Sequence, residues 1–274
     1  MTWIASGDRI LMSDDGSGNG SVENNLGLCM DVSVALPVAR PAPPLAVDEI
    51  HVWLADLWQP ADRLTALAAT LATEEQERAA RFRFPEQRDR FSVGRGLLRE
   101  LLGAYLDRPA AALRFEQGAH GKPVLAGVDA AAGLHFNLSH SGKRALYAVA
   151  RCELGVDLED MDRAVSHAAI AERICSPQEW AAFQALPAEQ IHEVFFTCWT
   201  RKEAIAKALG GGLAIGLRAL EVCFPEGKTL DGRVTLHDGQ GQEWSVLNLL
   251  LESGWSGALA AAGAGWRWRG WRWG

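Results

Sequence analysis

Two long segments with helical spacing, separated by several short strand-like segments, constrain the fold of this chain most. Residues 88–106 place Phe91, Leu97, Leu98 and Leu101 at helical intervals, and residues 189–209 end at three consecutive glycines, a strong stop signal. The order along the chain is strand, helices, strands, helices, strands. It predicts an α+β fold made of two similar α/β halves, each with one long helix and a short sheet, that meet near Cys152.

The remaining elements follow from shorter patterns. Thr73 is expected to cap one helix, with Gln76 three residues on, and Ser176-Pro177 to open another. Further helices are expected at residues 63–71, 74–84, 166–174 and 178–186. Strands are expected at residues 51–57, 113–116, 134–138, 146–150, 154–158, 222–224, 233–237, 244–249 and 257–261.

The two ends of the chain differ from the middle. Residues 1–47 combine a Gly/Ser/Asn/Asp-rich stretch with a proline-rich one and are expected to form a disordered leader. Residues 263–274 alternate Trp with Arg and are expected to lie beyond the folded domain, although a membrane-surface or cation–π role is an alternative. The N-terminal half is therefore assigned to residues 48–151 and the C-terminal half to residues 152–262.

Composition excludes several classes of protein. The net charge of -7 argues against a protein whose whole surface binds nucleic acid. The five cysteines are irregularly spaced without a CxxC pair, which argues against a zinc site or disulfide framework. No secretion signal or apolar run of membrane-spanning length is found, so a cytoplasmic protein without a membrane anchor is expected.

Two acidic residues alternate with apolar ones in Gly155-Val156-Asp157-Leu158-Glu159. On a strand, Asp157 and Glu159 would point to one face while Val156 and Leu158 point to the core. Neighbouring carboxylates repel unless a proton or a cation lies between them, and Mg²⁺ suits such oxygen ligands. A solvated strand end with two surface acids is the alternative, and this motif alone does not decide between them.

The second long helix carries charges beside apolar residues. Glu203 and Lys207 lie four residues apart and share a helix face. An ordinary surface pair is one interpretation. The apolar surroundings of Lys202, Glu203 and Lys207 favour another, in which Glu203 completes a metal site and the lysines neutralise phosphate.

Two polar turns and one basic helix add candidate anion contacts. Ser139, His140 and Ser141 follow a strand and could bind phosphate, serve as a simple turn, or form a Ser-His pair, although no nucleophile-elbow motif is present. Lys122 lies in a Gly-Lys-Pro turn and could be idle or reach a phosphate. Residues 78–99 hold seven arginines and two acids. Most of these arginines are expected to form a solvated helix face, although such a patch also attracts polyanions, including nucleic acid.

Taken in order, GKP, FNLSHSG, GVDLE and FxxxWxxKEAxxK resemble the 4′-phosphopantetheinyl transferases of the larger, pseudo-dimeric Sfp type. The resemblance runs from about residue 73 to about residue 213. It implies a pseudo-dimeric fold with the active site between the halves, coenzyme A and an apo carrier protein as substrates, Mg²⁺ as the cofactor, and a monomer. The carrier would belong to a peptide synthetase, polyketide synthase or fatty acid synthase, with secondary metabolism as a natural setting.

The resemblance also implies roles for single residues. Asp157, Glu159 and Glu203 match the metal carboxylates, and Glu203 also matches the general base for the carrier serine. Lys207 matches a lysine that assists charge neutralisation and proton handling. The expected coenzyme A contacts are Arg78, Arg90, Lys122, Ser139, His140 and Lys202. A non-catalytic module that binds coenzyme A or a carrier protein is the alternative, and a nucleic-acid binding protein is a second.

Overall fold

The computed structural model describes most of the chain. The described residues are 42–118, 121–211, 216–222 and 241–273, with the backbone of the short strands at 2–5, 10–13, 22–24, 30–31 and 234–237. Within them, no helix is both long and apolar enough to cross a membrane.

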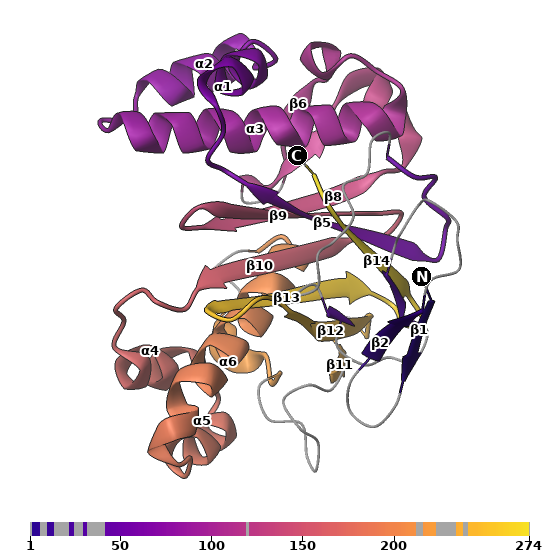
Figure 1. Ribbon diagram of the computed structural model, residues 1–274. Helices are drawn as coiled ribbons and strands as arrows, with labels where there is room; N and C mark the ends of the chain where they lie inside the picture. The colour runs from indigo at the N-terminus through magenta and orange to yellow at the C-terminus, as the bar shows by residue number, and fades with distance from the viewer. Residues whose placement is uncertain are drawn as a thin grey trace.

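The folded part is arranged in layers. Helices α1 (Ala61–Ala68), α2 (Thr73–Ala80) and α3 (Pro85–Leu106) lie on one outer side, and α4 (His167–Ile174), α5 (Pro177–Gln184) and α6 (Ala188–Ala208) lie on the other. Two sheets lie between these groups (Figure 1). Each half of the chain thus supplies one long helix and most of one sheet.

The N-terminal sheet has the strand order β3-β14-β5-β9-β8. Its strands are β3 (Val22–Asn24), β14 (Arg267–Arg272), β5 (Glu49–Asp56), β9 (Arg144–Ala150) and β8 (His135–Ser141). The α3 side chains Leu97, Leu98 and Leu101 pack on Trp53 and Tyr147 of this sheet. A hairpin of β6 (Phe115–Gln117) and β7 (Pro123–Leu125) and the short helices η1 (Ala110–Ala112) and η3 (Gly127–Ala132) connect α3 to β8.

The C-terminal sheet has the order β10-β13-β12-β11, and β4 pairs with β12. Its strands are β10 (Leu154–Asp160), β13 (Trp255–Ala262), β12 (Glu243–Leu250), β11 (Val234–His237) and β4 (Met30–Asp31). The α6 side chains Phe195, Phe196 and Ile205 pack on Val246 and Ala258 of this sheet. The short helix η5 (Leu217–Ala219) follows α6.

Alternation along the strands decides which side chains reach the interior. Ile50, Val52 and Leu54 of β5 share one buried cluster with Val156 and Leu158 of β10. This apolar cluster fills the space between the two sheets. The expectation that Val156 and Leu158 face the core is confirmed, and the intervening acids of β10 must therefore face the other way, toward α6.

Gly155 allows α6 to approach β10 closely. A Cβ atom at this position would lie only 2.2 Å from the carbonyl oxygen of Ala204 and 2.4 Å from the amide nitrogen of Ala208. Any side chain here would push the helix away. The absent side chain therefore brings the last turns of α6, with Glu203 and Lys207, against the acidic strand.

The helix boundaries lie within three residues of those expected from the sequence, except at the end of α2. Ser176 caps α5 and forms a reciprocal capping box with Glu179, as expected. Helix α2 begins at Thr73 itself, so the expected N-cap is wrong by one residue: Ala72 is the N-cap, and Glu75 bonds back to its amide. This helix also ends at Ala80 rather than near residue 84, because Pro85 starts α3. Residues 223–224 of the expected strand at 222–224 lie outside the described residues.

The Trp/Arg-rich C-terminal segment is part of the fold, which corrects the expectation that it lies beyond the domain. Strand β14 runs parallel to β5 and antiparallel to β3. Trp268, Trp271 and Trp273 are each only 3% exposed, and Trp271 stacks on Trp53 with ring centroids 4.7 Å apart. Trp271 and Trp273 share the face of the sheet that packs under α3, and Trp268 points to the opposite face, between the two sheets. All three are buried because both faces of this sheet are covered.

The first 47 residues lie largely outside the described part of the chain. The described segments there include the short strands β1 (Thr2–Ala5) and β2 (Ile10–Ser13), which pair with each other. In the same region, β3 joins the N-terminal sheet and β4 the C-terminal sheet. Ala42 and Leu45, which precede β5 in the chain, pack against the apolar cluster beneath α3.

Candidate active site

The two sheets meet along a polar seam between their edge strands β8 and β10. Asn137 accepts a hydrogen bond from the amide of Val156 through its side-chain oxygen (3.0 Å). Two residues on, Ser139 donates to Asp157 Oδ1 (2.8 Å). After two more residues, Ser141 donates to Glu159 Oε2 (3.0 Å). Every second side chain of the FNLSHS motif therefore bridges to the acidic strand.

Lys207 connects α6 to this seam. Its ammonium donates to Asp157 Oδ1 (2.7 Å) and to Ser139 Oγ (2.8 Å). Glu159 is held separately, by the indole of Trp199 at 2.8 Å and by Arg163 at 3.2 Å. The sequence-predicted residues Ser139, Asp157 and Lys207 are thus in direct contact.

The carboxylates act on one another electrostatically. Burial, and next the charge of Asp157, raise the pKa of Glu203, against the opposing effect of Lys207. Burial and the charge of Asp157 likewise raise the pKa of Glu159. These mutual effects place the three carboxylates in one acidic group that has too few cations to balance it.

Two oxygens in this group have no partner among the described residues: Asp157 Oδ2 and Glu203 Oε1 are both buried and unbonded. Buried carboxylate oxygens without donors are costly, and a hard divalent cation is the ligand that such oxygens suit. Within the described residues, no three metal-binding side chains lie close enough together to hold an ion as they stand. The donor chemistry fits a cation, and the side chains would have to draw together around it.

A pocket of about 750 Å³ opens beside the seam. It runs between α2, α3 and the β6–β7 hairpin on one side and the ends of β8 and α6 on the other. Four residues predicted to contact coenzyme A line it, namely Arg78, Arg90, Lys122 and His140, together with the predicted catalytic residue Lys207. Its volume lies in the usual range for a site that holds a small molecule.

These lining residues differ in the contacts that their charged groups already make within the protein. The guanidinium of Arg78 lies over the ring of Phe91 (5.2 Å), and that of Arg90 donates to the carbonyl of Gly142 (3.0 Å). Lys122 pairs with Glu153 (3.0 Å). His140 is at the surface; desolvation, followed by the charges of Lys207 and Arg90, lowers the pKa of its imidazole, which favours the neutral form.

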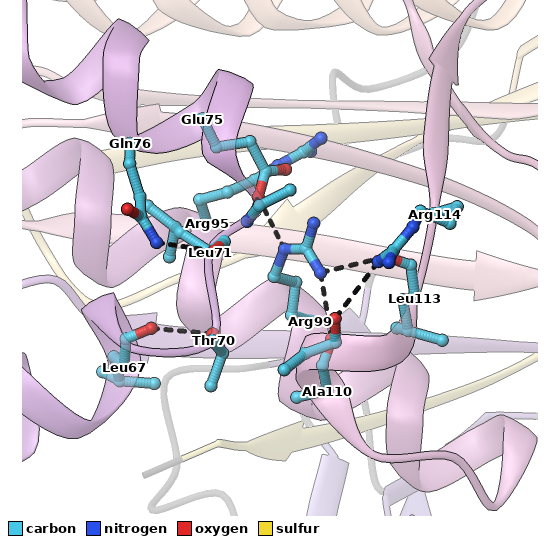
Figure 2. A network of polar contacts seen from close by, with 12 residues as sticks. Leu67, Thr70, Leu71, Glu75, Gln76, Arg95, Arg99, Ala110, Leu113 and Arg114 are labelled. Carbon is cyan, nitrogen blue, oxygen red and sulfur yellow. Dashed lines mark hydrogen bonds and ion pairs between the residues drawn. The ribbon is translucent and has the colours of Figure 1, made fainter.

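The far end of the pocket is lined by arginines that share Glu75 (Figure 2). Arg99 donates to Glu75 Oε2 (2.6 Å), and Arg95 pairs with the other oxygen. Arg99 also binds the carbonyls of Ala110 and Leu113 (3.0 and 3.2 Å), and its side chain is only 1% exposed. We call Glu75, Arg78, Arg95, Arg99 and Arg114 the arginine end of the pocket.

Sequence reasoning missed most of the arginine end. The sequence pattern predicts mainly a solvated face for the arginines of residues 78–99. A usable signal existed, since Arg95 and Arg99 lie four residues apart among the apolar positions of α3, where an unpaired charge would be costly. Phe115 was also missed; Arg95 lies over its ring at 4.2 Å.

The structure corrects the assignment of Lys202 to the coenzyme A phosphates. This side chain is fully buried and pairs with Glu179 at 2.7 Å. Its ammonium also binds the carbonyls of Leu217 (2.9 Å) and Leu220. Lys202 does not line the pocket, and its contacts connect α6 to α5 and η5.

Comparisons with known proteins agree with this geometry. The model of the 4′-phosphopantetheinyl transferase N-terminal family matches residues 56–152, and that of the 4′-phosphopantetheinyl transferase superfamily matches residues 153–260. The chain is 39% identical over 231 residues to the 4′-phosphopantetheinyl transferase HetI of Nostoc sp., covering 83% of this chain and 94% of that protein.

Other relatives carry the same name. The chain is 33% identical to the 4′-phosphopantetheinyl transferase psf-1 of Bacillus pumilus (64% of this chain, 71% of that protein). It is 28% identical to Sfp of Bacillus subtilis (61% and 70%). These names favour an enzyme over the alternative of a non-catalytic binding module, and the two adjacent family matches confirm the two-half fold. The chain belongs to the 4′-phosphopantetheinyl transferase superfamily, in its Sfp-like class.

Proposed function

We propose that the chain transfers the 4′-phosphopantetheine group of coenzyme A to a serine of an apo carrier protein, and that the reaction depends on Mg²⁺. The observation that carries this proposal is a pocket that is lined by arginines and also by Lys207. Lys207 pairs with Asp157, and Asp157, Glu159 and Glu203 form the acidic group next to the pocket at Lys207, which we call the acidic end. A ligand that joins a phosphorylated nucleotide to a pyrophosphate matches both ends.

The arginine end supports binding of the nucleotide part. Arg78 and its neighbours supply the charge that phosphate oxygens need, and Arg95 is held over the ring of Phe115 in the same wall of the pocket. Lys122, His140 and Arg90 line the middle of the pocket. Once the nucleotide lies there, the pyrophosphate would extend toward Lys207.

The acidic end supports the chemistry. Glu203 accepts the proton of the carrier serine, directly or through a water molecule. The serine oxygen attacks the phosphorus that bears the pantetheine arm. The P–O bond to the other phosphate breaks, and adenosine 3′,5′-bisphosphate leaves with that bond's electrons. Lys207 offsets the developing negative charge.

Asp157, Glu159 and Glu203 would hold the Mg²⁺ ion. When bound, the ion supplies charge neutralisation for the pyrophosphate oxygens. Ser139 keeps Asp157 and Lys207 in place through hydrogen bonds to both. The assignment of Ser139 changes accordingly, from a direct coenzyme A contact to a positioning residue. A carrier of the peptide synthetase, polyketide synthase or fatty acid synthase type, and a cytoplasmic location, remain part of the proposal.

The proposal is tested by intact-mass measurement. The purified protein is incubated with coenzyme A, Mg²⁺ and each of several apo carrier proteins. We expect one carrier to gain a single phosphopantetheine group, and to gain none when EDTA is present. If no carrier gains the group, the proposed activity is contradicted. If transfer is complete in EDTA, the proposed metal requirement is contradicted.

A further inference from the structure

Exposed aromatic and arginine side chains lie on segments that adjoin the pocket-lining residues Arg78 and Arg90. They lie on the β5–α1 loop, on the α2–α3 corner and in the first turn of α3. We call this set the aromatic–arginine rim; it comprises Trp58, Arg81, Phe82, Arg83, Phe84 and Arg88.

The rim is unusual for its exposure. Trp58 is 79% exposed and Phe84 54% exposed. Among the described residues only five large apolar side chains are exposed, and three of them lie here. Exposed apolar groups that gather in one place indicate an interaction surface, whereas scattered ones need no explanation.

The charges of the rim are largely available. Arg81 and Arg88 have side chains that are 80% and 52% exposed. Each touches one acid, Glu77 at 4.0 Å and Asp89 at 3.0 Å, and such exposed pairs are weak. Between residues 78 and 90 there are five arginines and two acids, in a chain whose net charge is -7. The surface therefore complements an acidic partner.

Two hydrogen bonds place the rim beside the acidic end of the pocket. The amide of Leu57, next to Trp58, donates to the carbonyl of Lys143 (2.7 Å), and Arg90 of α3 donates to that of Gly142 (3.0 Å). A Cβ atom on Gly142 would lie 2.7 Å from Asp160, which follows Glu159. Figure 1 shows the start of α3, the β8–β9 turn and the end of β10 on the same side of the molecule.

We propose that the aromatic–arginine rim is the docking surface for the acceptor protein, and that it takes an acidic protein surface with an apolar spot at its centre. This inference rests on the proposed function. The acceptor must bring a hydroxyl group to the acidic end, and a protein seated on the rim is adjacent to that end. Aromatic and arginine side chains are also the residues that most often dominate protein–protein binding energy.

The test separates acceptor binding from coenzyme A binding. Phe84→Ala, Trp58→Ala and the double variant Arg83→Glu/Arg88→Glu are compared in the intact-mass assay with an apo carrier that the unchanged protein modifies. We expect each to raise the KM for the carrier about tenfold, with the KM for coenzyme A and the kcat at saturating carrier within about twofold. Raising the salt concentration should weaken carrier binding in the unchanged protein and much less in the double variant.

Matched controls lie elsewhere on the surface. Val128 is 73% exposed and Arg218 is exposed on η5, so Val128→Ala and Arg218→Glu should leave the carrier KM unchanged. Thermal melting curves verify that every variant is folded. An unchanged carrier KM in Phe84→Ala and in the double variant would overturn the inference, and so would equal changes in the controls.

Two further binding experiments test whether the rim binds nucleic acid or a membrane surface instead of a protein. The unchanged protein and the double variant are tested for binding to a short DNA duplex and to phosphatidylcholine/phosphatidylglycerol vesicles. Rim-dependent binding to either, with an unchanged carrier KM, would overturn the inference. If no carrier is modified, the proposed function fails; calorimetric titration with apo carrier proteins then decides the docking inference, which is supported only by binding that the rim variants weaken.

Discussion

At the arginine end of the pocket two arginines share a single carboxylate, whereas at the acidic end, next to Lys207, three carboxylates share few cations. Glu75 forms ion pairs with Arg95 and Arg99. Burial raises the pKa of Glu75, but the hydrogen bond from Arg99 and the charge of Arg95 outweigh burial, so the pKa lies below its ordinary value. At the acidic end the balance is reversed, and burial and neighbouring charge raise the pKa of Glu203.

This difference indicates whether the charged groups of each end find their partners on folding or only when a ligand binds. At the arginine end, Arg95 and Arg99 are paired with Glu75 before any ligand binds, so the geometry of these side chains is set by folding. The acidic end keeps two buried carboxylate oxygens without partners among the described residues. Such a group is stabilised only when a cation arrives, which makes this end a place where binding and chemistry are coupled.

The largest effect is expected from Glu203→Gln. Loss of one carboxylate removes the proposed base and one oxygen ligand, so the transfer rate should fall at least about 1000-fold. The same change relieves charge repulsion, so the free energy of unfolding should not decrease. Single-turnover mass measurements and thermal melting give the two values. A variant with near-normal activity would show that Glu203 does not carry the chemistry.

The opposite response is expected from Glu75→Ala at the arginine end. This change leaves Arg99 buried without its carboxylate, which should cost about 3 kcal/mol of unfolding free energy. Urea unfolding measures it. Glu77→Ala serves as the control, because Glu77 is 63% exposed and should cost less than about 0.5 kcal/mol. Equal losses in the two variants would mean that the buried network does not stabilise the fold.

A smaller effect is expected from Ser139→Ala. Ser139 touches no substrate in the proposed mechanism and holds Asp157 and Lys207 through its hydroxyl. We expect the kcat to fall about tenfold, equivalent to about 1.4 kcal/mol, with little change in the KM for coenzyme A. Ser139→Thr keeps the hydroxyl and should recover most of the rate. A raised KM with normal kcat would instead indicate a direct coenzyme A contact.

The smallest effect concerns the pH dependence of stability. Because the pKa of Glu75 is lower in the folded state than in the unfolded chain, its stabilising contribution is present above its unfolded pKa and is lost as the pH falls through the folded one. Glu75→Gln should therefore flatten the fall in stability below about pH 4.5. Urea unfolding between pH 3 and pH 7 measures this slope. An unchanged slope would contradict the pairing.

The acidic end was predictable because its residues follow local rules. Strand alternation places Asp157 and Glu159 on one face, and helical spacing places Glu203 near Lys207. The assignment of Lys202 was wrong because α6 is apolar around much of its circumference, so helical spacing alone does not indicate that Lys202 points to Glu179.

The C-terminal strand could not be predicted from local pattern. Its position depends on pairing with β5, and Arg267 meets Asp48 across 219 residues of sequence. No local signal encodes such a partner. The arginine end could not be predicted for a similar reason. Glu75 and Arg99 belong to different helices, and only the packing of α2 against α3 brings them together.

Binding of a divalent cation to the acidic end tests the central claim most directly. Mn²⁺ can replace Mg²⁺ in a titration followed by electron paramagnetic resonance, with coenzyme A present and with the unchanged protein, Asp157→Asn and Glu203→Gln compared. We predict one bound ion per chain in the unchanged protein and clearly weaker binding in both variants. Absence of binding in the unchanged protein, or equal binding in all three, would contradict the claim that the acidic end is completed by a cation.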